Sequence, residues 1–300
     1  MQINNNQGPY ILTADIGGSH ITTGICELGT YFILPDSLAR TGLSSKASAK
    51  IILDSWSDAF RQTIKSVSVP ISGLALAMPG PFDYDKGISY IKGLNKYEAL
   101  YGMDIKAHLA EELNLHPDNI RFRNDAEATI AGEVLAGAGK GYQNVMGITL
   151  GTGFGSAHCI NNITKDINLG SEPFKNTIAD DILSTRWFLK QYYEATGISA
   201  AGVKELALIA EESKVSRDIF SQFAVNLSDF LEAPIDQFKP EVLIVCGNIA
   251  KASKLFLPYV RKRLTSTTII TGELGENAAL IGAAGLFENT AINQPITINQ

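Results

Sequence analysis

Asp15-Ile16-Gly17-Gly18-Ser19 follows a short apolar stretch at residues 10–14, and this strand with its glycine turn decides the fold. The apolar stretch is typical of a buried strand, and residues 21–28 predict a second strand that returns antiparallel. The pattern recurs later, where apolar residues 145–150 lead into Gly151-Thr152-Gly153 and a predicted returning strand over 154–160. Two copies of one strand–turn–strand unit, each accompanied by helices and further strands, indicate a duplicated α/β domain.

The rest of the chain supplies the helices and strands that such domains need. A helix is predicted to begin at Ser44 or Ser45, because apolar residues recur at helical spacing from Ile52 to Val67. Asn124-Asp125 opens an alanine-rich helix that ends near Gly137. Further strands are expected at 31–34, 71–78, 120–123, 242–246 and 268–270, and further helices at 178–195, 203–211, 217–231 and 278–287.

A chain of 300 residues is long enough for two domains. We expect a smaller N-terminal α/β domain over residues 1–123 and a larger α/β domain over residues 124–285. A C-terminal helix over about 286–300 is expected to pack back on the first domain.

Composition excludes several classes of protein. Hydrophobic residues make up 45% and charged residues 19% of the chain, which argues against general disorder. The net charge is −6 and the basic residues are scattered, so nucleic acid is not an expected partner. No apolar run reaches the ~20 residues of a membrane span, and the polar N-terminus does not have the form of a secretory signal. Three widely spaced cysteines give no disulfide framework or metal-ligand spacing. A soluble, cytoplasmic protein is expected.

The two glycine turns are candidate phosphate-binding sites. Glycines after a strand leave backbone N–H groups accessible to phosphate oxygens, Ser19 adds a hydroxyl, and Asp15 can hold Mg²⁺ or its water shell. Taken alone, either turn is better explained as a hairpin with a capping residue. Together they predict a clamp for phosphoryl transfer, and neither has the lysine of a Walker A loop.

Three further groups of polar residues could complete such a site. Asp125 at a strand-to-helix junction could accept a proton from an attacking hydroxyl, although Asn124 or Asp125 could equally be a helix cap. Carboxylates suit sugar binding because each accepts bonds from neighbouring hydroxyls, which makes Glu172 and Asp180 candidates. Ordinary surface acids are the alternative for that pair, and Asn95 is uninformative by itself.

Taken in order, these segments resemble the ROK family, and within it the bacterial glucokinases. The resemblance runs from about residue 11 to residue 286. It rests on Asp15-Ile16-Gly17-Gly18-Ser19-His20, Met78-Pro79-Gly80-Pro81, Asn95, Asn124-Asp125-Ala126, Gly132-Glu133, Thr149-Leu150-Gly151-Thr152-Gly153, Val245-Cys246-Gly247-Asn248 and Gly275-Glu276-Asn277-Ala278-Ala279.

The resemblance implies an actin-like (ribonuclease H-like) ATPase fold, with two duplicated α/β domains around a cleft that holds the sugar. It implies Asp125 as the catalytic base and ATP with Mg²⁺ as cofactors, the metal being held by Asp15. The implied sugar-binding residues are Gly80, Asn95, Asn124, Glu172 and Asp180. The implied phosphate- and nucleotide-binding residues are Asp15, Gly17, Gly18, Ser19, Gly151, Thr152, Gly153, Gly247 and Asn248. A homodimer is also implied.

The chain departs from the family pattern after residue 169. Gly170-Ser171-Glu172-Pro173-Phe174-Lys175 keeps the glutamate but lacks the usual histidine, and no zinc-binding cysteines follow, so no structural zinc is expected. Asp180 stands where a glutamate is usual, and Asp181 is a substitute candidate. These departures leave the sugar specificity open.

The main hypothesis is a kinase that transfers the γ-phosphoryl group of ATP to a hexose, with glucose as the first candidate and polyphosphate as an alternative donor. A non-catalytic sugar sensor of the same family is the second hypothesis, motivated by the altered segment around Glu172 and Asp180. A DNA-binding regulator is disfavoured by the acidic composition and by the nine residues that precede the first predicted strand.

Overall fold

The computed structural model of the protein describes residues 8–288, and within this range the chain forms two compact units. The first contains residues up to 136 together with residues from 276 onward, and the second is continuous from 137 to 275. The predicted boundary after residue 123 therefore moves to a point after helix α3 (Asp125–Ala136), because α3 packs within the first unit. Most of the C-terminal helix predicted at about 286–300 lies outside the described residues.

The first unit is built on a mixed sheet with the strand order β3-β2-β1-β5-β8, to which β4 is added beside β2. Strands β1 and β2 form the antiparallel hairpin predicted from the sequence, and β5 and β8 continue the sheet in parallel. The strands are β1 (Tyr10–Ile16), β2 (His20–Glu27), β3 (Phe32–Ile33), β4 (Ala39–Gly42), β5 (Ile71–Met78) and β8 (Ile120–Asn124). Two short strands, β6 (Phe82–Asp83) and β7 (Ile88–Ser89), form a separate hairpin.

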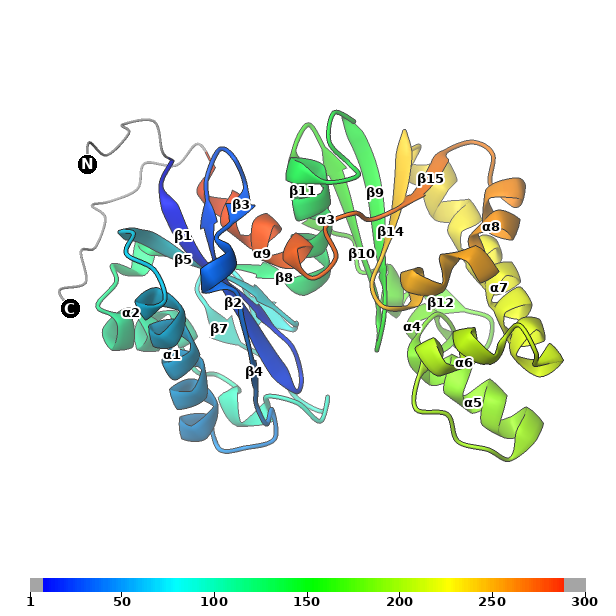
Figure 1. Cartoon of the computed structure of the whole chain (residues 1–300), viewed down its shortest axis with the longest axis horizontal. Helices are drawn as coiled ribbons and strands as arrows, with labels where there is room; N and C mark the ends of the chain where they lie inside the picture. The colour runs from blue at the N-terminus through cyan, green and yellow to red at the C-terminus, as the bar shows by residue number, and fades with distance from the viewer. Residues whose placement is uncertain (1–7, 289–300) are drawn as a thin grey trace. The chain divides into compact units, whose positions relative to one another are not determined.

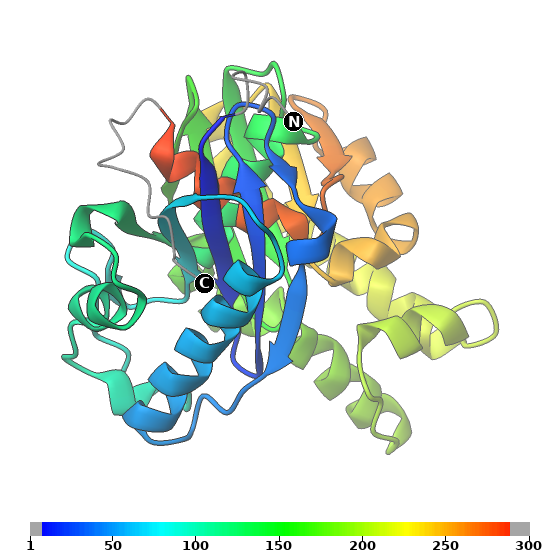
Figure 2. The same cartoon turned by 60° about the vertical axis from the view of Figure 1, so that its left-hand side comes forward.

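Helices cover both faces of this sheet (Figures 1 and 2). On one face, α1 (Ala49–Lys65) and α2 (Ile105–Leu113) pack on the large buried side chains of the strands. The other face carries small residues such as Gly24 and Ala77, and it receives α9 (Asn277–Ala284) together with α3. Alternation of large and small residues along the strands thus explains why the last helix can lie close to the sheet.

Helices α3 and α9 cross in direct backbone contact. A Cβ atom on Gly132 of α3 would lie 1.9 Å from the carbonyl oxygen of Ala278, and one on Gly282 of α9 would lie 1.8 Å from that of Ala128. Real Cβ atoms do not approach a carbonyl oxygen so closely, so glycine is required at both positions. The crossing fixes the start of α3, which carries Asn124 and Asp125 at its N-terminus.

The second unit repeats the arrangement, with the strand order β11-β10-β9-β14-β15. Strands β9 and β10 form an antiparallel hairpin, and β14 pairs in parallel with β9, as β5 does with β1. The strands are β9 (Asn144–Leu150), β10 (Phe154–Ile160), β11 (Ile163–Asp166), β14 (Val242–Cys246) and β15 (Thr268–Thr271), with a small hairpin of β12 (Pro173–Phe174) and β13 (Thr177–Ile178). The duplication predicted from the sequence is confirmed by this shared topology.

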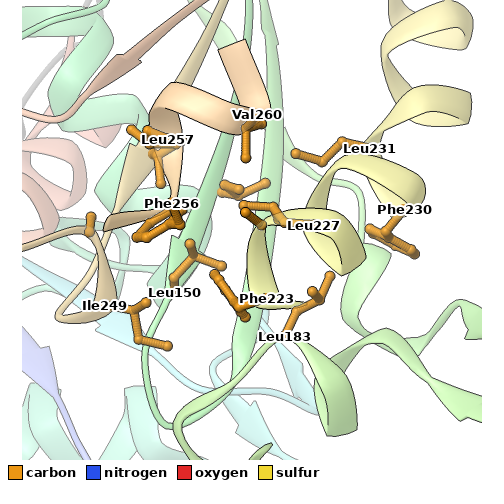
Figure 3. Close-up of a cluster of buried hydrophobic side chains, with 14 of the residues drawn as sticks. Leu150, Leu183, Phe223, Leu227, Phe230, Leu231, Ile249, Phe256, Leu257 and Val260 are labelled. Carbon is orange, nitrogen blue, oxygen red and sulfur yellow. The ribbon is translucent and has the colours of Figure 1, made fainter. Parts of the chain in front are cut away.

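The core of the second unit lies between its sheet and its helices (Figure 3). Phe223 and Leu227 of α7 meet Leu150 of β9 and Phe256, which precedes α8. The helices are α4 (Ala179–Ile182), α5 (Thr185–Thr196), α6 (Val203–Ile209), α7 (Lys214–Phe238) and α8 (Leu257–Arg263). Helix α7 is longer than the predicted 217–231 and continues through Pro234.

Two helix predictions are corrected by tertiary hydrogen bonds. Helix α1 is capped by Ser48 rather than Ser44 or Ser45, and the carbonyl of Ser45 accepts a bond from the N–H of Tyr97. The helix predicted over 178–195 is two helices, because the N–H of Thr185 bonds to the carbonyl of Gly151. Among residues 8–288, none of the helices combines the length and hydropathy that crossing a bilayer requires.

Candidate active site

The first glycine turn joins β1 to β2 and is open on one side. The N–H of Gly17 bonds to the carbonyl of His20 at 3.0 Å, which closes the turn. A Cβ on Gly17 would meet that same oxygen at 3.2 Å, whereas a Cβ on Gly18 would have no neighbour within 4 Å. Gly18 and Ser19 are exposed. The turn therefore leaves open space beside Gly18 where a phosphate oxygen could approach.

Asp15 lies beside this turn in a row of residues that crosses the sheet. It is opposite Thr22 of β2, and Thr22 is opposite Arg40 of β4, so all three side chains lie on the face that carries α3 and α9. The pKa of Asp15 is raised to about 7, chiefly by burial and also by the carboxylates of Asp125 and Glu276, while Arg40 opposes the shift. Repulsion among acidic groups at this point is what a divalent cation would relieve.

Arg40 is a site residue that the sequence reasoning missed. Its Nη1 atom bonds to both carboxylate oxygens of Glu276, at 2.9 and 3.0 Å, just before α9 begins. No strand was predicted at residues 39–42, and only the pairing of β4 with β2 brings Arg40 into the same row as Asp15, so the sequence carried no signal for it.

Asn124 and Asp125 begin α3, and the structure gives them different roles. The Asn124 Oδ1 atom accepts bonds from the N–H groups of Ala126 and Glu127, at 2.9 and 3.1 Å, so Asn124 is the helix cap. Its Nδ2 atom donates to the hydroxyl of Tyr84 at 3.3 Å. Asp125 accepts a bond from Ala126 N–H through Oδ1 at 2.8 Å. Within the described part of the chain, Asp125 Oδ2 accepts no hydrogen bond.

The loops after β5 and β7 hold the other predicted sugar-binding residues of the first unit. A Cβ on Gly80 would lie 3.1 Å from the hydroxyl of Tyr84, the group that contacts Asn124. Asn95 has a left-handed backbone, with φ of 58°, and its N–H bonds to Glu98 at 2.9 Å. Asn95 also lines a pocket of about 190 Å³. The other lining residues are Ser45, Lys46, Ala47, Lys96, Glu98 and Ala99.

Tyr97 connects this loop to the first glycine turn. Its buried hydroxyl donates a hydrogen bond to the carbonyl oxygen of Gly17, and its ring meets Trp56 edge-on at 5.5 Å. Tyr97 has φ of 53°, a left-handed conformation that is uncommon for an aromatic residue. The sequence carries no local signal for this contact, because the two residues are 80 positions apart.

The second glycine turn joins β9 to β10. The N–H of Gly151 bonds to the carbonyl of Gly153 at 3.0 Å, and the carbonyl of Gly151 accepts a bond from Thr185 at 2.8 Å. Thr152 is exposed, and a Cβ on Gly151 would have no neighbour within 4 Å. Like the first turn, this one closes on itself and leaves open space on one side.

Asp180 and Glu172 are placed differently from each other. Asp180 Oδ1 accepts a bond from Phe154 N–H at 2.5 Å, and Oδ2 pairs with Arg186, another residue that the sequence reasoning missed. Glu172 has an exposed side chain, and its backbone carbonyl accepts a bond from Ala179 N–H at 2.9 Å. The structure thus brings Asp180, but not the Glu172 side chain, to the second turn.

Gly247 lies against the end of β9, next to the same turn. It has φ of 90°, and a Cβ there would lie 2.4 Å from the carbonyl oxygen of Leu150. Only glycine combines this backbone conformation with such a close approach. The neighbouring Asn248 accepts a bond from Lys251 through Oδ1 at 2.8 Å.

The donors present fit a magnesium ion bound mainly by other ligands. Among residues 8–288, no group of three or more His, Cys, Asp or Glu side chains is arranged to hold a metal. Mg²⁺ characteristically takes one or two carboxylates and completes its shell with water and phosphate oxygens. Asp15, next to an open glycine turn, matches that requirement.

Two α/β units of the same topology, each with a glycine turn between its first two strands, define the actin-like ATPase fold. The chain belongs to the ROK family, whose model matches residues 11–168. It is 21% identical to a glucokinase of Thermotoga maritima, over 93% of this chain and 97% of that enzyme. It is 24% identical to the xylose repressor of Bacillus subtilis, over 95% of this chain and 79% of the repressor.

A solved structure shows the same fold. The ROK family glucokinase from Streptomyces griseus, in complex with glucose and AMPPNP, superposes with a TM-score of 0.76 at 21% identity. The match covers 92% of this chain and 98% of that one.

Proposed function

We propose that this protein is a hexose kinase, which transfers the γ-phosphoryl group of ATP to a sugar hydroxyl, with glucose as the proposed substrate. The observation that carries the proposal is the position of Asp125. Its carboxylate lies close enough to Asp15 to raise the pKa of Asp15, and it has one oxygen outside the cap of α3. A candidate base therefore lies beside a candidate phosphate turn within one compact unit.

Asp125 would take the proton of the attacking hydroxyl. The N-terminus of α3 favours a negative charge there, and the bond from Ala126 N–H engages Oδ1, which leaves Oδ2 as the oxygen that would accept the proton. Asn124, Asn95, Gly80 and Glu172 are the proposed sugar-binding groups of the chain. For Asn124 only the second hydrogen of Nδ2 is available, since Oδ1 caps the helix.

The glycine turns would bind phosphate oxygens through backbone N–H groups and the hydroxyls of Ser19 and Thr152. Gly17, Gly18, Gly151 and Gly153 add no side chain of their own to these turns, and Gly247 with Asn248 would lie near the nucleoside. Mg²⁺ held by Asp15 would supply charge neutralisation for the transferred group. The residues of the chain hold and orient the reactants, which is the larger part of catalysis in phosphoryl transfer.

A substrate panel tests the proposal. Glucose, other hexoses and N-acetylhexosamines are each assayed for phosphorylated product with ATP and with polyphosphate, with and without Mg²⁺. We expect ATP-dependent product with glucose or another hexose, and no product without the metal. Absence of product with every sugar and both donors would contradict the proposal.

A sugar sensor is the second candidate, and one observation favours it. The segment around Glu172 and Asp180 departs from the family pattern of the kinases, and Asp180 is bound within the chain to Phe154 N–H and Arg186. The sensor hypothesis expects calorimetric sugar binding without release of ADP. The kinase hypothesis expects both, so the two measurements on one preparation separate them.

The proposal extends to a homodimer in the cytoplasm, with sugar and nucleotide as its partners rather than nucleic acid. Light scattering of the purified chain measures the oligomeric state directly. A monomer at all concentrations would remove the dimer from the proposal without affecting the kinase assignment.

A further inference from the structure

Asp180 is held against the second glycine turn by two hydrogen bonds, one to each carboxylate oxygen. Its Oδ1 accepts the backbone N–H of Phe154 at 2.5 Å, and the same oxygen would lie 2.8 Å from a Cβ on Gly153. Its Oδ2 pairs with the guanidinium of Arg186. The carboxylate therefore fills the space next to Gly153 that a side chain would otherwise occupy.

The surrounding backbone is shaped to admit this carboxylate. A Cβ on Gly170 would lie 2.3 Å from the carbonyl oxygen of Phe154 and 3.8 Å from the Cβ of Asp180, so glycine lets this loop close on the turn. The N–H of Thr185 bonds to the carbonyl of Gly151 at 2.8 Å on the other side. Two helices are thus bonded to the turn. Asp180 of α4 accepts the N–H of Phe154 after the turn, and Thr185 of α5 donates to the carbonyl of Gly151 at its start.

Two properties suit Asp180 to this place: the short length of its side chain and the positive charge of its partner Arg186. Asp180 starts in α4 and reaches Phe154 N–H at hydrogen-bond distance, and a longer acid starting at the same Cα would have to bend to keep this contact. An unpaired carboxylate next to a phosphate-binding turn would repel the anion. Arg186 offsets that charge, and its side chain is 58% exposed.

We propose that Asp180 is a positioning residue that fixes the shape of the second phosphate turn, rather than a ligand of the sugar. It acts on the phosphate donor through Phe154 N–H and Gly153. Its kinetic consequence rests on the proposed kinase function, whereas its effect on the turn does not.

Amide hydrogen exchange of the ligand-free protein tests the structural part. Asp180→Ala removes the acceptor of Phe154 N–H, and we expect exchange at Phe154 to accelerate at least about tenfold, the scale of losing a charge-assisted hydrogen bond. Asp180→Asn keeps an acceptor oxygen and is expected to restore most of the protection. Asp181→Ala is the matched control, because Asp181 bonds to Thr177 and pairs with Arg186 at 3.8 Å but makes no bond to Phe154, so exchange at Phe154 is expected to stay unchanged.

Binding and kinetics test the functional part with AMPPNP, ATP and glucose, or the best hexose of the panel. We expect Asp180→Ala to weaken AMPPNP binding and to raise KM for ATP by about tenfold or more, with KM for the sugar within twofold of wild type. Asp180→Asn is expected to recover most of the lost affinity. If Asp180 instead bound the sugar, Asp180→Ala would raise KM for the sugar and leave KM for ATP unchanged.

Three outcomes overturn the proposal: unchanged exchange at Phe154 in Asp180→Ala, unchanged AMPPNP affinity despite faster exchange, or a defect confined to the sugar. If the wild-type protein neither binds AMPPNP nor phosphorylates any sugar, the proposed function fails. The exchange measurement still decides whether Asp180 holds the turn.

Discussion

The hydroxyl of Tyr97 donates a hydrogen bond to the carbonyl oxygen of Gly17, so the loop that carries Asn95 is tied directly to the first phosphate turn. The bond is made in the core, with the Tyr97 ring fully buried against Trp56. One buried oxygen thus connects a predicted sugar loop to a predicted phosphate turn within the first unit.

Tyr97→Phe should therefore lower stability and loosen the first turn while keeping the ring in place. Leaving the Gly17 carbonyl without its partner is expected to cost about 1–3 kcal/mol of unfolding free energy and to raise KM for ATP. Urea unfolding and steady-state kinetics measure the two effects. Tyr101→Phe is the control, since Tyr101 is 53% exposed. A Tyr97→Phe protein as stable as the control would show that the bond contributes nothing.

Asp125→Asn should abolish turnover without abolishing sugar binding. The amide keeps the size of the carboxylate and an oxygen for Ala126 N–H, but it cannot accept the proton of the sugar hydroxyl. We expect turnover to fall at least ~100-fold, the scale of losing a general base, with the calorimetric affinity for the sugar retained. The exposed Asp118→Asn is the matched substitution. Near-normal turnover in Asp125→Asn would refute the assignment of Asp125.

Asp15→Asn should make the metal-free protein more stable at alkaline pH. The folded pKa of Asp15 is about 7, above its ordinary value of 3.8, because of burial and the facing Asp125 and Glu276, with Arg40 opposing. The folded state thus holds its proton longer than the unfolded chain, and stability falls as pH rises from about 4 to 7 and stays low above it. Tyr97, whose own pKa is raised chiefly by burial, also faces Asp15.

The comparison is made by thermal unfolding in chelator at pH 5 and pH 8. A difference of one unit between the folded and unfolded pKa corresponds to about 1.4 kcal/mol. The unfolding free energy that Asp15→Asn gains at pH 8 is therefore on the order of a few kcal/mol, and the gain is smaller at pH 5. Asp85→Asn, at an exposed position, serves as the control and should show no such pH-dependent gain. An Asp15→Asn protein that is less stable than wild type at pH 8 would contradict the argument.

Gly132→Ala and Gly282→Ala should both destabilise the first unit. Each methyl group would collide with a carbonyl oxygen across the α3–α9 crossing, and the helices must separate to admit it. Overpacking of this kind typically costs about 1–3 kcal/mol, which a shift in the urea midpoint reports. Gly42→Ala is the control, because a Cβ there has no neighbour within 4 Å. Equal midpoints for all three variants would show that the crossing can relax.

The central strands of both sheets and both glycine turns were predictable from the sequence because their signal is local, whereas short strands such as β4 and β11 were not predicted. An apolar run followed by glycine specifies a strand and its end in a few residues, as at residues 10–18 and 145–153. The roles of Asn124 and Asp125 were not separable in this way. Both residue types cap helices, and only the hydrogen bonds show that Asn124 is the cap.

What the sequence did not reveal depends on contacts between distant residues. Helix α1 is capped at Ser48, later than predicted, because the carbonyl of Ser45 is bonded to Tyr97. The single helix predicted over 178–195 is interrupted where Thr185 bonds to Gly151. Arg186 likewise gains its partner only after the chain has turned between α4 and α5. No local pattern encodes these partners, since each is fixed by the tertiary fold.

The placement of α9 has a consequence for the order in which the chain matures during synthesis. Residues 137–275 form an uninterrupted unit that contains its own sheet and core, so it can fold as soon as it leaves the ribosome. The first unit cannot complete its fold until α9 has been synthesised, because one face of its sheet is covered by this helix, which ends at Ala284. The part of the protein that is translated first is therefore the part that is finished last.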